Sequence, residues 1–249
     1  MHKKPFILFN GGDGSGKGVQ KERVASLVGE YVSVREPGGT KEAEIIRDIL
    51  LSTTHREEDR EECFHILFES PLHTLTHTYL THAYNEIRRN GLNGAAEVYL
   101  YAASRNESNK NVVQKARRDG RIILGDRSVA CSMAYQAGSR GMGADWVWSV
   151  NEPTLDGAFP DLELFLDVPT SVAQKRLEAR TEKRDRLDLE SLSFHEKARE
   201  GYLTYYKTYC PYPYAIVPAD GTIEDVHSTI MDVLRSSNLY DSLIEKGED

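Results

Sequence analysis

Residues 9–20, FNGGDGSGKGVQ, place closely spaced glycines and one lysine directly after a short apolar run. The segment fits the phosphate-binding pattern G-x-x-x-x-G-K-[ST] through residue 17. Glycines have no Cβ atom, so successive backbone N–H groups can converge on phosphate oxygens, and a helix beginning at Lys17 adds its positive end. Lys17 also brings a full charge to the β- and γ-phosphates. The loop predicts a site for a nucleoside triphosphate, formed by Gly11, Gly12, Asp13, Gly14, Ser15, Gly16, Lys17 and Gly18.

Gly18 departs from this pattern, which has a hydroxyl at that position as a magnesium ligand. Mg²⁺ keeps several bound waters, so a carboxylate and the substrate phosphates can hold it instead. The segment RIILGDR ends a strand in Asp126 and Arg127, at the sheet edge where open α/β folds bind ligands. We predict that Asp126 holds Mg²⁺ through water, with ATP as the donor, and that the Arg127 guanidinium grips a phosphate with two parallel N–H groups.

Apolar runs predict buried strands at residues 5–10, 121–126 and 162–168, and further strands at residues 31–36 and 214–219. Helical spacing or capping predicts helices within residues 17–31, 40–51, 170–180 and 191–206. Strands that alternate with helices indicate a parallel sheet covered on both faces. The 249 residues therefore predict a single α/β domain with a central parallel sheet of about five strands.

Residues 52–94 interrupt this alternation with charged residues and with repeated histidines and threonines. They predict a helical insertion. His73, His77 and His82 lie along the insertion, but no further metal ligands can be placed beside them, so a polar helix face is the favoured interpretation. We expect no metal there.

The bulk composition limits the class of partner. A formal net charge of −8 argues against binding to DNA or to an anionic membrane through bulk charge. The N-terminal apolar run is too short for a signal peptide, and no run has the length of a membrane span. Three widely spaced cysteines suit a reducing compartment. We therefore expect a cytoplasmic protein with no nucleic-acid or membrane partner.

Several stretches together resemble the thymidylate kinase family: FNGGDGSGKGVQ, REPGGTKEAEIIRDILL, EVYLYAASR, ILGDRSVACSMAYQ, PDLELFLDVP and RDRLDLESLSF, in family order. The resemblance covers most of residues 5–207 apart from the insertion. It implies a P-loop nucleoside-monophosphate-kinase fold and transfer of the ATP γ-phosphoryl group to dTMP, giving dTDP and ADP. It also implies a homodimer.

The resemblance assigns the residues around the acceptor's base and sugar. Tyr101 matches an aromatic that stacks on thymine, and Arg105, four residues on, matches an arginine that hydrogen-bonds the base. Ser132 and Tyr135 lie at the base and sugar positions, where the Tyr135 ring would crowd a ribose 2′-hydroxyl. Asp13 matches an acid that addresses the sugar 3′-hydroxyl. These assignments imply a preference for thymidine monophosphate.

The resemblance also assigns the phosphate contacts. Arg127 and Arg47 match residues that bind the acceptor phosphate. The phosphate loop has Gly14 and Ser15 and no arginine, and family members of this kind carry basic residues in a mobile lid, here at about residues 176–188. Phosphoryl transfer needs cations around the moving group. The resulting catalytic set is Lys17, Arg127, Arg180 and Arg184.

Two departures keep alternatives open. Family members commonly have an aromatic residue after the Asp-Arg pair, where this chain has Ser128. The insertion precedes the base-binding helix, so it could line or cover the acceptor site, or it could equally form an oligomer surface. A kinase of another nucleoside monophosphate on the same fold, or a nucleotide-binding homologue without catalysis, therefore remains an alternative to a dTMP kinase.

Overall fold

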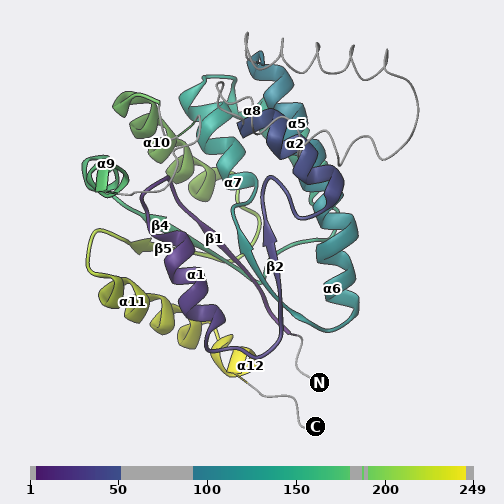
Figure 1. Cartoon of the computed structure of the whole chain (residues 1–249), viewed down its shortest axis with the longest axis vertical. Helices are drawn as coiled ribbons and strands as arrows, with labels where there is room; N and C mark the ends of the chain where they lie inside the picture. The colour runs from purple at the N-terminus through teal and green to yellow at the C-terminus, as the bar shows by residue number, and fades with distance from the viewer. Residues whose placement is uncertain (1–3, 52–91, 180–186, 188–189, 245–249) are drawn as a thin grey trace, which may run out of the picture.

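A computed structural model of the chain describes residues 4–51, 92–179, 187 and 190–244 (Figure 1). Its strands lie within the five apolar runs of the sequence, so all five strand predictions are confirmed. They are β1 (Phe6–Asn10), β2 (Tyr31–Arg35), β3 (Ile122–Asp126), β4 (Leu162–Asp167) and β5 (Tyr214–Pro218).

Helices occupy all four segments where the sequence predicts them. These are α1 (Lys17–Ala25), α2 (Lys41–Leu51), α9 (Thr170–Ala179) and α10 (Leu192–Thr208). The further helical elements are α5 (Gly94–Ser108), η1 (Asn109–Val113), α6 (Gln114–Arg118), α7 (Val129–Ser132), η2 (Met133–Ser139), α8 (Ala144–Asn151), η3 (Glu152–Thr154), α11 (Ile223–Ser236) and α12 (Tyr240–Ile244). In the part of the chain that the structure describes, no helix combines the length and apolar character needed to cross a membrane.

Helix α1 ends earlier than its apolar spacing predicts. The sequence favours a helix that continues to the region of Gly29, whereas α1 stops at Ala25. Leu27 and Val28 instead make tighter hydrogen bonds to carbonyls three residues back, and the Ser26 hydroxyl donates to the Arg23 carbonyl at 2.7 Å. A serine that bonds its own backbone competes with the helix, so the last turn tightens and stops.

The sheet is parallel throughout, with strand order β2-β3-β1-β4-β5. Phe9 of β1 lies opposite Asp126 of β3, and Asn10 lies opposite Phe165 of β4. The segments that follow β1 and β3 therefore emerge side by side at the carboxyl edge. Strands β2 and β3 lie on one side of β1, and the later strands β4 and β5 lie on the other. Ligands of open α/β sheets bind at the point where the strand order reverses in this way.

Helices cover both faces of the sheet, as the sequence predicts (Figure 1). Alternate side chains of a strand point to opposite faces. In β1, Ile7 and Phe9 pack with α1 and α11, whereas Phe6 and Leu8 pack with η1 and α6. Phe165 of β4 faces the aromatic side of α10. The inner strands β3, β1 and β4 are therefore buried between the helices, whereas the edge strands β2 and β5 keep several exposed side chains.

Glu163 is a carboxyl group in the middle of β4, and its residue is fully buried. Burial raises the pKa of Glu163 to about 7; Ser128, Tyr206 and Asn10 face the group and only partly oppose this. No hydrogen bond of good geometry reaches either carboxyl oxygen within the described residues. The folded protein therefore keeps a proton on Glu163 at pH values where the unfolded chain loses it.

Glu163→Gln is expected to flatten the pH dependence of stability. Between pH 4.5 and about 7 only the folded state holds this proton, so the wild-type free energy of unfolding should fall as pH rises, by on the order of 3 kcal/mol in total. Glutamine copies the neutral acid and removes that loss. Urea unfolding from pH 5 to pH 8 would measure it, with the exposed Glu196→Gln as a control that keeps the wild-type slope. Parallel curves for Glu163→Gln and wild type would contradict a buried proton at this position.

The predicted domain features fall largely outside the described residues. Of the insertion at 52–94, only residues 92–94 are described, and there Asn93 caps α5 by accepting a hydrogen bond from the Ala96 N–H at 2.9 Å. His73, His77 and His82 lie outside the described residues, as do most residues of the lid at 176–188. Residues 176–179 of that range belong to α9. The insertion and the lid stay predictions.

Candidate functional site

Three glycines with positive φ shape the loop between β1 and α1. Their φ angles are 156° at Gly11, 79° at Gly14 and 82° at Gly16. A Cβ atom on Gly14 would lie 2.5 Å from the Ala173 carbonyl oxygen, so a side chain there is excluded by both conformation and space. Among the described residues no side chain caps the start of α1. Its first backbone N–H groups are thus available to an anion.

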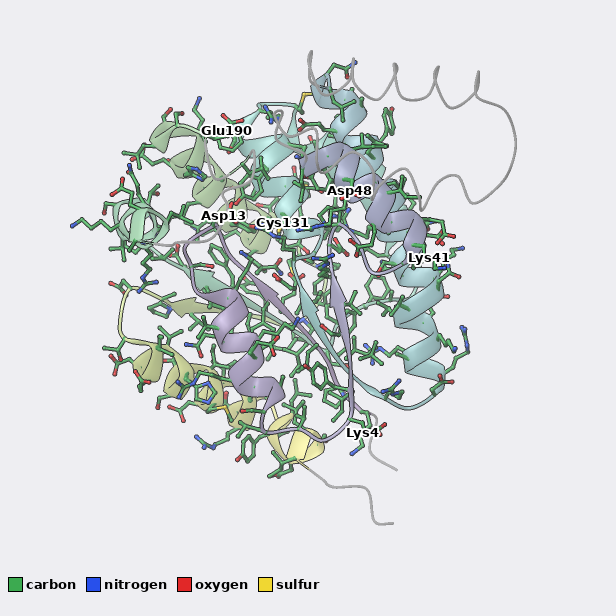
Figure 2. The ribbon with its side chains drawn as sticks, viewed as in Figure 1. Lys4, Asp13, Lys41, Asp48, Cys131 and Glu190 are labelled. Atoms are coloured by element: carbon green, nitrogen blue, oxygen red, sulfur yellow. The ribbon has the colours of Figure 1, made fainter. Side chains whose placement is uncertain are left out.

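Asp13 joins the loop to the segment after β3. Its Oδ1 lies 3.7 Å from Lys17 Nζ and accepts a hydrogen bond from Arg127 Nη2, while Tyr135 donates its hydroxyl to Oδ2 at 3.1 Å. Figure 2 shows Asp13 beside Cys131 of α7, near the upper ends of the strands. Residues from three separate segments therefore meet at one carboxylate.

The charges of this cluster fix its protonation. Burial alone would raise the pKa of Asp13, but the adjacent Arg127 and Lys17 charges outweigh it and hold the pKa well below its usual range. The same Asp13 carboxylate raises the pKa of Arg127 against the effect of burial. The two cations and one carboxylate leave this cluster with a net positive charge, which suits a phosphate ligand.

A pocket opens beside this cluster, between α2, α5 and the α7–η2 helix. It gathers six of the seven residues that the sequence assigns to the acceptor site: Arg47, Tyr101, Arg105, Arg127, Ser132 and Tyr135. The seventh, Asp13, contacts two of these side chains. Residues that are far apart in the sequence thus line one pocket, as a single ligand site requires.

Arg105 is held rigidly in the wall of this pocket. Its side chain is 2% exposed; Nε donates to Glu36 at 2.7 Å, Nη2 donates to Ser132 Oγ at 3.2 Å, and Nη1 donates to Asn151 Oδ1. Burial raises the pKa of Glu36, although the Arg105 charge opposes this. A guanidinium fixed on three sides presents one orientation to the pocket.

Glu36 and Asn151 are absent from the residues that the sequence singles out. Glu36 lies in the REPGG turn at the carboxyl end of β2, so its place at the ligand edge was the available signal. Asn151 ends α8, an element with no ligand motif, and only the fold brings it to Arg105.

Tyr101 and Arg47 approach the pocket from two helices. Tyr101 lies one turn before Arg105 on α5 and is 8% exposed. Arg47 lies on α2, and its Nη1 donates to the Pro37 carbonyl at 3.0 Å. The pocket therefore has an aromatic wall beside Arg105 and a cation anchored to the REPGG turn.

Asp126 ends β3 beside the phosphate loop and is the candidate metal residue. Its Oδ1 is buried and has no hydrogen-bond partner among the described residues. Buried polar atoms are normally bonded, so an oxygen of this kind fits a hydrated divalent cation. Gly18 is exposed in the first turn of α1, and a Cβ atom there would meet no atom within 4 Å. The donors present thus fit a metal held through water.

Arg180 and Arg184 lie outside the described residues, so their catalytic role stays a prediction. The nearby Arg176 is described: it donates to the Ala219 carbonyl at 2.8 Å and to the Gly221 carbonyl at 3.1 Å. It therefore ties α9 to the loop after β5. Leu187, from the same region of the sequence, lines the acceptor pocket.

A second cavity extends from the phosphate loop between α9 and α10. Gly12 and Asp13 line it on the loop side, and Tyr135 lines both cavities. The Asp13 cluster therefore lies where two hollows meet. This geometry can bring two ligands to the same charged centre.

Comparisons with known proteins agree with the geometry. A family model described as thymidylate kinase matches residues 65–230. A thymidylate kinase from Leuconostoc mesenteroides subsp. mesenteroides is 36% identical over 209 residues, 82% of this chain and 82% of that protein. One from Clostridium novyi is 33% identical, covering 84% of this chain and 88% of its own, and one from Kosmotoga olearia is 34% identical, covering 91% and 93%. The similarity extends over most of each chain.

Proposed function

The chain belongs to the thymidylate kinase family, and on this basis we propose that it transfers the γ-phosphoryl group of ATP to dTMP, giving dTDP and ADP. The observation that carries the proposal is the Asp13 carboxylate, which contacts Lys17 of the phosphate loop and Arg127 of the acceptor pocket. Phosphoryl transfer depends on positioning and on charge around the moving group. A single ionic cluster shared by loop and pocket supplies both.

In this proposal the ATP phosphates lie over the glycine loop and the first turn of α1. Lys17 neutralises charge on the β- and γ-phosphates, and Arg127 binds the acceptor phosphate through its fork of N–H groups. Asp13, ionised and held by Arg127 and Tyr135, accepts a hydrogen bond from the sugar 3′-hydroxyl. We further propose that Arg180 and Arg184 meet the transition-state charge, with Arg47 as a second cation for the acceptor phosphate.

The acceptor's base has a matching set of side chains. We propose that thymine stacks on Tyr101 and hydrogen-bonds Arg105, with Ser132 at the base position. The contacts of Arg105 with Glu36 and Ser132 support this, since a fixed guanidinium discriminates between base edges better than a mobile one. The buried Tyr135 ring, fixed to Asp13, would crowd a 2′-hydroxyl and thereby favour deoxyribose.

The reaction of this family is ATP-dependent and generally needs a divalent metal, which we propose is Mg²⁺. Asp126 would hold the ion through bound water, since its Oδ1 is buried beside the loop and lacks a partner among the described residues. When bound, Mg²⁺ neutralises developing charge on the β- and γ-phosphate oxygens.

Gly18→Thr is expected to raise the affinity for Mg²⁺ several-fold in the presence of ATP. The position has room for a side chain, and threonine adds the hydroxyl that the motif usually offers to the metal. Calorimetric titration of Mg²⁺ into protein with ATP would measure the effect. Gly18→Val, which has the same shape without the hydroxyl, is the control and should match wild type. Equal affinities for the threonine and valine variants would show that the missing hydroxyl is no deficit.

We propose a cytoplasmic homodimer without a nucleic-acid partner. The formal net charge of −8 and the unpaired Cys131 and Cys210 support the compartment and the absence of nucleic acid. The dimer follows from the family resemblance. Light scattering on purified protein would test it by giving twice the chain mass of 28.1 kDa.

The test of the proposed function is ADP release from Mg-ATP with a panel of acceptors. The panel comprises dTMP, dUMP, dCMP, dAMP, dGMP and the ribose form of thymidine monophosphate. Turnover should be fastest with dTMP and much slower with the ribose form. Fastest turnover with another base would make the chain a kinase of that nucleotide, and no turnover with any acceptor would leave a nucleotide-binding protein.

A further inference from the structure

Tyr202 of α10 lines the second cavity and reaches the phosphate loop from there. Its residue is 1% exposed, and its hydroxyl donates to the Gly11 carbonyl at 3.3 Å. The same oxygen lies 3.0 Å from Cys131 Sγ, which in turn accepts a hydrogen bond from Arg127 Nη1 at 3.7 Å. A continuous chain of contacts thus runs from the loop through Tyr202 and Cys131 to Arg127.

Both ends of this chain have unusual backbone conformations. Gly11 has a φ of 156°, and Arg127 has a φ of 71°, in the left-handed region that side chains other than glycine seldom adopt. Such conformations persist where surrounding contacts hold them, and they are common in functional sites. The Arg127 N–H donates to the Phe9 carbonyl at 2.9 Å, so its backbone is tied to β1 next to the loop. Its guanidinium needs further support.

The supports of the Arg127 guanidinium come from two sides. Nη2 bonds Asp13, and Nη1 faces Cys131, which is packed against the Tyr202 hydroxyl. Burial raises the pKa of Tyr202, so the hydroxyl keeps the proton that it donates to Gly11. The tyrosine ring is itself clamped, stacked on Phe165 with centroids 4.9 Å apart. A rigid donor therefore lies between the loop and the arginine.

We propose that Tyr202 is a positioning residue that couples the ATP phosphate loop to the acceptor-binding arginine. Its hydroxyl orients the Gly11 carbonyl directly and the Arg127 guanidinium through Cys131. The two phosphate-binding groups are thereby held at a fixed separation. The inference rests on the proposed function, since it assigns the loop to the donor and Arg127 to the acceptor.

The chain offers a matched control on the same helix. Tyr206, one turn after Tyr202, is also buried and also stacks on Phe165, with centroids 5.2 Å apart. Its hydroxyl faces Glu163 and has no hydrogen-bond partner of good geometry among the described residues. Removing either hydroxyl leaves the ring packing intact, but only Tyr202→Phe breaks the link to the loop.

The test compares Tyr202→Phe with Tyr206→Phe in full-length protein. Tyr202→Phe should lower kcat/KM for dTMP by about tenfold, because small misplacements of reacting groups are costly, and should weaken ATP binding several-fold. Tyr206→Phe should stay within about twofold of wild type in both measurements. Melting temperatures of the two variants should be similar. Equal kinetics for two folded variants would overturn the proposal and leave Tyr202 a packing residue.

Cys131→Ala tests the second half of this series of contacts, from Tyr202 through Cys131 to Arg127. It should raise KM for dTMP while leaving ATP affinity unchanged, and it also serves if Tyr202→Phe does not fold. Cys131 lines the acceptor pocket, so the double variant decides the matter. If both side chains act through one chain of contacts, Cys131→Ala should add little to Tyr202→Phe, whereas effects that multiply would contradict the coupling.

These readouts separate the proposal from the function on which it rests. A wild-type protein without turnover on dTMP would refute the proposed function. ATP binding measured by calorimetry without an acceptor would still compare Tyr202→Phe with Tyr206→Phe. Equal ATP affinities would then refute the positioning of Gly11 as well.

Discussion

Lys17→Ala should lower kcat by about three orders of magnitude or more and leave the fold intact. Lys17 is the lysine of the phosphate loop, and its charge is the one the motif directs to the β- and γ-phosphates. Its side chain is only 12% exposed, and its Nζ forms an ion pair with Asp13 at 3.7 Å. The alanine variant should thus lose the charge that we propose acts in the transition state, while Arg127 still neutralises Asp13. Steady-state kinetics with dTMP and Mg-ATP, together with circular dichroism, would measure both effects.

Lys21→Met provides the control for Lys17→Ala. Lys21 lies one turn further along α1, and its Nζ donates to Ser33 of β2 at 3.0 Å, away from the loop. This variant should lose some stability and keep nearly all activity. Near-normal turnover in Lys17→Ala would show that the loop is not the donor phosphate site.

Arg127→Ala should lower kcat/KM for the acceptor by about 100-fold or more. The variant removes the forked cation that we propose binds the acceptor phosphate, and charge-assisted contacts of this kind are strong. KM for dTMP should rise and kcat should fall, whereas KM for ATP should change much less. Initial rates at varied dTMP and saturating ATP would separate these effects.

Stability has to be measured alongside, because Arg127 also neutralises Asp13. The carboxylate is buried with a pKa held low by Arg127 and Lys17, so losing its nearest cation should destabilise the protein by on the order of 3 kcal/mol. Arg127→Lys keeps the charge but loses the fork, so it should recover part of both stability and rate. Unchanged acceptor kinetics in a folded Arg127→Ala variant would contradict the assignment of the acceptor site.

Much of the fold could be predicted because its signals are local. Each strand is a short, largely apolar run, and the three inner strands β3, β1 and β4 are buried, so such runs need no tertiary information to be recognised. The conformation of the phosphate loop is likewise predictable, because the positions in the loop that have positive φ are glycines in the sequence. The acceptor side chains could be grouped only through the family resemblance, and the structure then brings Tyr101, Arg105 and Arg127 to one pocket.

The residues that escaped prediction depend on contacts between distant segments. Tyr202 lies 191 residues from Gly11 in the sequence, and nothing in the tyrosine-rich stretch of α10 separates it from Tyr206. Asn151 supports Arg105 from another helix in the same way. In the sequence Glu163 is an acidic residue within a largely apolar strand, whereas its raised pKa arises from burial in the assembled core. Which side chains contact each other in these cases depends on how the helices and strands pack.

The most direct test of the account follows the label from γ-labelled ATP in a mixture of purified protein, Mg²⁺ and dTMP. Because the loop and the acceptor pocket meet at Asp13, we expect labelled dTDP in an amount equal to the ADP formed. ADP without labelled dTDP would mean that water is the acceptor. Tight ATP binding without any labelled product would contradict the central claim, and the chain would then be a nucleotide-binding member of its family.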